Sequence, residues 1–176
     1  MRLYMVKPLI SLEEIKRLIE SDKNINTDKE NDLYLLHQAV ILNSLEVCKD
    51  IIEAGANINV LDKKGYSPLH HAVHSKCTDI CKYLLSVGAD VELQSKDGYT
   101  PLHMAATKGD IYIISDLLVA GADIEAKMNN GETAIYIAIE ESNFDIFKLL
   151  LEAGADIEAR DQFGITPLMR AAKAKK

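Results

Sequence analysis

Glycine recurs along this chain of 176 residues at a fixed interval of 33 residues. Eight of the nine glycines fall into two series. One series is Gly55, Gly88, Gly121 and Gly154, and the other is Gly65, Gly98, Gly131 and Gly164. Self-similarity at a period of about 20 to 50 residues is typical of stacked repeats, in which each unit buries its apolar sides against its neighbours. The chain is therefore expected to form a repeat array.

The residues after the second glycine series predict helix starts. Ser67, Thr100 and Thr166 each stand where an N-cap is needed, and each is followed by proline. Proline is well tolerated at the first helical position because the N–H group that it lacks would have no helical partner there. The pattern predicts that the first helix of each repeat begins at these prolines.

Apolar spacing predicts two helices in each repeat. Leu102, Ala105 and Ala106 lie at i, i+3 and i+4, and Ile113 and Leu117 continue this pattern in a second segment. The small residues of the first helix allow a neighbouring helix to approach closely. The first-series glycines follow the second helix, where a left-handed C′ residue is favoured.

These segments resemble the ankyrin repeat. The period is 33, the sequence Thr-Pro-Leu-His stands at residues 100–103, and each unit closes on a sequence similar to Leu-Leu-x-x-Gly-Ala-Asp. The resemblance covers residues 28–176. It implies an all-α repeat solenoid, an ankyrin helix-loop-helix stack with projecting hairpin-like loops, and a non-catalytic role in protein–protein interaction.

The repeat frame predicts a single ankyrin array over residues 1–176. Its boundaries are 1–27 for a partial N-terminal unit, 28–60, 61–93, 94–126 and 127–159 for full repeats, and 160–176 for a partial C-terminal unit. Residues 11–20 are expected to form the outer helix of the first partial unit, and the short segment before Pro8 is its only candidate for a first helix. The last helix is interpreted as a cap, with a fragment of a longer array as the alternative.

Charge and composition limit the partners. The formal net charge of −7 disfavours nucleic acid and anionic membranes. No apolar run approaches the roughly 18 residues that a membrane span needs. Three cysteines, an odd and low number, indicate reduced thiols. We expect a cytoplasmic monomer.

Neither catalysis nor metal binding has a convincing candidate. The chain contains no phosphate-binding loop, nucleophile elbow or zinc-protease motif. The nearest metal-like cluster is His70, His71, His74, Cys77 and Cys81. Against it, His70 belongs to the repeat motif and Cys81 follows Cys48 by one period, so both are expected to be structural. We predict no catalytic residues, no metal and no cofactor.

The resemblance also implies where a partner binds. In the family, variable positions beside the loop glycine and at the end of the first helix line the concave recognition face. The residues carried over to this chain are Lys64, Tyr66, His74, Tyr99, Lys108, Glu132, Glu140, Glu141 and Phe163. Three of them are aromatic residues close to a loop glycine and are expected to be exposed interface anchors.

Acidity suggests the chemistry of the partner. Repeat 127–159 has seven acidic and two basic residues, a net charge of −5. A partner that binds there is expected to present Lys or Arg. The alternatives are the targeting portion of a longer enzyme or secreted effector, and a compact inhibitor of a signalling protein. Binding through the convex side, where Lys82 and Lys148 lie, also stays open.

Overall fold

The structure is a computed structural model that describes residues 11–20 and 34–174. The chain divides into two compact units, Met1–Ala89 and Asp90–Lys176. Over the described ranges the regular elements are ten α-helices, and no strand is present there. The expected all-α repeat fold is confirmed.

The first unit pairs successive helices. It contains α1 (Leu12–Glu20), α2 (Leu35–Ile41), α3 (Leu45–Glu53), α4 (Pro68–His74) and α5 (Thr78–Ser86). α2 packs against α3 and α4 against α5, and α2 also contacts α4. α1 packs against α3, which confirms the helix expected over residues 11–20. The segment before Pro8 lies outside the described residues.

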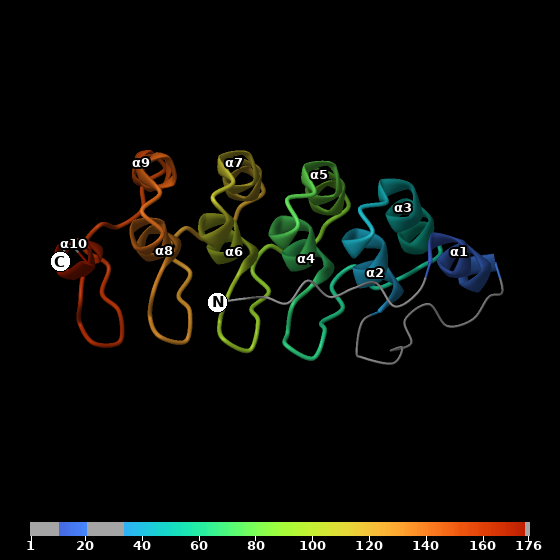
Figure 1. The fold of residues 1–176 in the computed structure, drawn as a ribbon, viewed down its shortest axis with the longest axis horizontal. Helices are drawn as coiled ribbons and strands as arrows, with labels where there is room; N and C mark the ends of the chain where they lie inside the picture. Colours follow the sequence, from blue (N-terminus) through green and yellow to red (C-terminus); the bar gives the residue numbers. More distant parts are fainter. Residues whose placement is uncertain (1–10, 21–33, 175–176) are drawn as a thin grey trace. The chain divides into compact units, whose positions relative to one another are not determined.

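The second unit repeats this arrangement. It contains α6 (Pro101–Lys108), α7 (Ile111–Val119), α8 (Ala134–Glu140), α9 (Phe144–Glu152) and α10 (Pro167–Ala174). α6, α8 and α10 form one row, α7 and α9 form a second row, and the loops before α8 and α10 extend from the first row on the side away from the second (Figure 1).

The predicted N-caps are confirmed. The side chains of Ser67 and Thr100 accept hydrogen bonds from the backbone N–H groups of His70 and His103. Each histidine Nδ1 in turn accepts from the cap's own backbone N–H at 3.2 Å. Histidine therefore completes a capping box in the place where glutamate commonly does so. Thr166 caps α10 through the backbone N–H of Met169 at 3.3 Å.

The fourth full repeat builds its helix start differently. α8 begins at Ala134, but the side chain of Thr133 makes no capping hydrogen bond. Tyr136 replaces the motif histidine, and its hydroxyl donates to the carbonyl of Ala159 and accepts from the N–H of Asp161, both at 3.2 Å. A tyrosine thus connects this helix to the following loop.

Left-handed residues occur at another repeated position that the two glycine series do not reveal. Gly121 has φ +92° after α7, as expected for a C′ residue. The ninth glycine, Gly109, has φ +70° after α6, and the residues one or two periods away from it are Lys76, Ser142 and Asn43, with φ of 56°, 55° and 52°. The turn between the two helices of a repeat therefore requires a left-handed residue even where the sequence has no glycine.

Side chains link neighbouring loops in the second unit. Glu92 Oε1 accepts from the N–H of Asp123, and Glu125 Oε1 accepts from that of Asp156, both at 2.7 Å and both across 31 residues. Three further hydrogen bonds span 33 residues. They join Gln94 to Lys127, Lys127 to Arg160 and Asn129 to Lys96, from side-chain nitrogen to backbone carbonyl.

Candidate functional site

The loops before α4, α6 and α10 are each braced by a side-chain oxygen at their first residue. Asp62 Oδ1 accepts from the backbone N–H groups of Lys64 and Tyr66 at 2.8 and 2.9 Å. Ser95 and Asp161 do the same in the loops before α6 and α10. These bracing residues carry a sequence signal, an Asp or Ser three residues before the loop glycine, which the repeat pattern described above does not include. We call these loops, the loop before α8 and the last turns of α4, α6, α8 and α10 the loop face of their own unit.

In the first unit, a buried aromatic cluster supports the loop. His71 Nε2 lies 3.0 Å from Asp62 Oδ2, and its ring meets that of His37 edge-on at 5.1 Å. Burial alone would raise the pKa of Asp62, but the hydrogen bonds from His71 and from two backbone N–H groups outweigh it and hold the pKa below its usual value. The loop base is therefore fixed by the hydrogen bond between His71 and Asp62 and by ring packing.

Tyr66 belongs to this cluster and is not an exposed anchor. Its side chain is 3 % exposed, and its ring lies 5.5 Å from that of His70 and 6.2 Å from that of His71. The expectation that the projecting backbone keeps this ring exposed is wrong, because the braced loop folds it back onto α4. Lys64 is exposed at the loop tip, and His74 is half-buried in the last turn of α4.

In the second unit, Phe163 is the predicted anchor that is exposed. Its side chain is 75 % exposed in the loop before α10. Tyr99 is half-buried, with its ring edge-on to His103 at 6.3 Å, and Lys108 is half-buried in the last turn of α6.

The predicted acidic residues meet a cation of this chain itself. Arg170 on α10 pairs with Glu132, with Glu140 at 2.8 Å and with Asp161 at 3.0 Å. Glu132 is buried, so the expectation that its side chain is free for a partner is wrong. Glu140 keeps 39 % of its side chain exposed, and Glu141 is exposed.

Negative charge remains in excess around Arg170. Three carboxylates share its one guanidinium group, and Glu141 follows directly in the chain. The pKa of Glu140 is raised above its ordinary value, first by burial and then by the nearby charge of Glu132. This region of the second unit therefore favours an additional cation.

In residues 11–20 and 34–174, no group of three or more His, Cys, Asp or Glu side chains is placed to hold a metal ion. Cys48, Cys77 and Cys81 are free thiols and all are buried. Within the same ranges, no helix has the length and apolarity that a membrane span requires.

Comparison with known proteins gives one family. The family model described as ankyrin repeats (3 copies) matches residues 6–95 and 87–161, which together cover most of the chain. No curated protein matches the chain.

Proposed function

Because the chain belongs to the ankyrin repeat family, whose repeats are generally protein–protein interaction modules, we propose that it binds a partner protein through the loop face. Ankyrin repeat domains are typically non-catalytic, and the proposed role of this chain requires no chemical step. The proposal treats residues 1–176 as one array with the repeat boundaries given above.

The bracing of the loops is the observation that carries this proposal. In three loops, one side-chain oxygen fixes two backbone N–H groups, so the backbone that presents Lys64 or Phe163 is already ordered before binding. A preorganised surface loses less conformational entropy on association. The exposed ring of Phe163 then offers the kind of aromatic anchor that is enriched in interfaces.

The proposed contact residues are the predicted set without its two buried members. Tyr66 and Glu132 are left out because their side chains are buried. The remaining members are Lys64, His74, Tyr99, Lys108, Glu140, Glu141 and Phe163. The excess of carboxylates around Arg170 supports a partner that presents Lys or Arg to Glu140 and Glu141, and it opposes a nucleic acid partner.

The proposed function also includes a cellular compartment and an oligomeric state. The three free thiols support a reducing compartment, which we take to be the cytoplasm. We propose that the chain is a monomer when it binds its partner.

Affinity capture with the full chain tests the proposed function. Partners identified by mass spectrometry are purified, and their affinity is measured for the wild type, for Phe163→Ser and for Glu141→Lys. Phe163→Ser is expected to weaken binding by about tenfold, and Glu141→Lys to slow association and reduce its salt dependence. Lys82→Ala on α5 and Lys148→Ala on α9 serve as matched surface controls. Loss of binding in these controls, with the two loop-face variants unchanged, would place the interface on the opposite side.

A further inference from the structure

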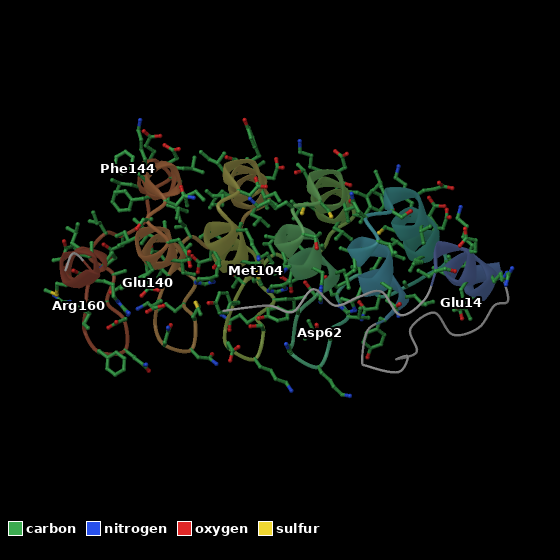
Figure 2. The ribbon with its side chains drawn as sticks, viewed as in Figure 1. Glu14, Asp62, Met104, Glu140, Phe144 and Arg160 are labelled. Carbon is green, nitrogen blue, oxygen red and sulfur yellow. The ribbon has the colours of Figure 1, made fainter. Side chains whose placement is uncertain are left out.

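A second surface of the second unit is hollow and apolar. A groove of about 340 Å³ lies between α8, α9 and α10. Its apolar lining includes Ala138, Ile139, Phe144, Phe147, Leu168 and Ala171. Figure 2 shows Phe144 on the side of α9 that faces away from α7. The groove is thus separate from the loops that form the loop face.

The preceding helices of the same unit show what such a groove holds. α9 packs on α8 and also contacts α7, and its Ile146 and Leu150 are fully buried there. Beneath it, Ala138 of α8 is fully buried. The corresponding residue of α10, one period later, is Ala171, which is only half-buried. The groove therefore has the shape of the site in which α9 packs, one repeat further along, and it can accommodate a helix.

The α9 side of the groove shows the same difference. Ile114 of α7 is fully buried, whereas Phe147, one period later, is half-buried. Across the groove, Leu168 of α10 is 50 % exposed, although its counterpart Ile135 on α8 is fully buried. Large apolar side chains thus line both walls and remain in contact with solvent, which marks an interaction site in a soluble protein.

The aromatic residues at the edge of the groove are typical of a surface that binds a partner. Phe144 and Phe147 lie with ring centroids 6.3 Å apart, and Phe144 is 72 % exposed. The same two positions of α7 carry the isoleucines Ile111 and Ile114. Exposed aromatic rings beside an apolar depression are typical of the anchor regions of protein interfaces.

The charge beside the groove indicates which side chains a bound helix would carry on its edge. Glu140 and Glu141 stand between Ile139 and Ser142, two residues that line the groove. Arg170 pairs with Glu140 but is shared with Glu132 and Asp161, and Glu141 makes no ion pair among the described residues. This edge of the groove is therefore acidic and complements a basic side chain.

We propose that the groove between α8, α9 and α10 binds an amphipathic helix of a partner protein. The helix places branched aliphatic side chains, spaced at i and i+4 like Ile146 and Leu150 of α9, between Phe147 and Ala171. A lysine or arginine on its flank meets Glu141. This surface shares Glu141 with the proposed loop face, but Phe163 belongs to the loop face alone and Phe144 and Leu168 to the groove alone, so variants of these three residues distinguish the two proposals.

A synthetic helix serves as the probe. The peptide has the sequence of residues 143–153 with Asp145→Lys, and a side-chain staple on its polar face keeps it helical, since isolated short helices are marginal in water. Binding of the fluorescently labelled peptide to the full chain is followed by anisotropy. A second peptide with Ile146→Asp and Leu150→Asp lacks the apolar face and is expected not to bind.

Matched protein variants locate the binding. Phe144→Ser with Leu168→Ser removes apolar surface from both walls of the groove and is expected to weaken binding by at least about tenfold. Val119→Ser with Tyr112→Ser makes the same kind of change at exposed residues of α7 and is expected to stay within about twofold, because surface changes elsewhere are nearly neutral. Circular dichroism and thermal melting verify that all variants are folded.

The outcomes separate the two proposals. Phe163→Ser should leave peptide affinity unchanged, and Glu141→Lys should weaken it and flatten its salt dependence. Equal loss in the groove and α7 variants, or absence of peptide binding to the folded wild type, would overturn the helix site. Sedimentation that shows a wild-type dimer, abolished by Phe144→Ser with Leu168→Ser, would assign the groove to a second copy of the chain and also refute the proposal.

Discussion

Tyr66→Ala is expected to destabilise the first unit strongly. A tyrosine side chain buries about 150 to 250 Å² when fully enclosed, and that of Tyr66 is 3 % exposed. At about 25 cal/mol/Å², this area corresponds to roughly 4 to 6 kcal/mol. The unfolded chain already buries part of such surface, which lowers the expected loss to roughly 2.5 to 5 kcal/mol. The ring contacts with His70 and His71 are the packing that the truncation removes.

Urea unfolding followed by far-UV circular dichroism measures this loss. Tyr66→Phe keeps the ring and should lose at most about 1 kcal/mol, the scale of one hydrogen bond. Phe163→Ala is the exposed aromatic control and should stay within about 0.5 kcal/mol of the wild type. If Tyr66→Ala unfolds at the wild-type urea concentration while Phe163→Ala loses more than about 1 kcal/mol, the assignment of buried and exposed aromatic residues is wrong.

Three further changes test the repeat geometry. Lys76→Gly should raise the free energy of unfolding by about 0.5 kcal/mol, because the strain that lysine has at φ +56° is larger than the entropy cost of ordering a glycine. A lower urea midpoint than that of the wild type would contradict this reasoning. Tyr136→Phe should lower the free energy of unfolding by about 1 to 3 kcal/mol in the same assay, because the carbonyl of Ala159 and the N–H of Asp161 lose their buried partner. An unchanged urea midpoint would mean that water replaces the hydroxyl. Burial lowers the pKa of His103 to about 4, so between about pH 6.5 and pH 4 the unfolded state binds a proton that the folded state does not. The free energy of unfolding should therefore fall with falling pH in this window, by up to about 1.4 kcal/mol per pH unit. In urea unfolding measured at several pH values, His103→Gln should show a weaker pH dependence of this free energy than the wild type. The same pH dependence in both proteins would exclude His103 as its source.

The fold was predictable because its signals are local and repeated. Thr100 followed by proline specifies a helix start from neighbouring residues alone, and Gly121 specifies a helix end in the same way. The left-handed turn at Lys76 escaped the glycine pattern because the surrounding packing imposes a conformation that lysine itself disfavours. Tertiary context, rather than residue preference, decides such a position.

The candidate site was less predictable because it depends on contacts between distant residues. A position beside a loop glycine indicates projecting backbone, but the direction of the Tyr66 ring depends on Asp62, which orders the loop, and on the rings of α4. Likewise, Glu132 and Arg170 are 38 residues apart, and their ion pair appears only when α10 is packed on α8. Charge summed by repeat identified the acidity of the region but not the cation inside it.

The side-chain bonds between neighbouring loops have a consequence for how such a chain can change in length. The pair Glu92 with Asp123 and the pair Glu125 with Asp156 use the same separation of 31 residues, one repeat apart. Duplication of a 33-residue segment in register would supply every new loop with the donor and acceptor that its neighbour needs. A gene for this unit can therefore lengthen by whole repeats while the existing hydrogen bonds keep their separation of 31 residues, whereas an insertion of another length between Glu92 and Asp123 would change that separation.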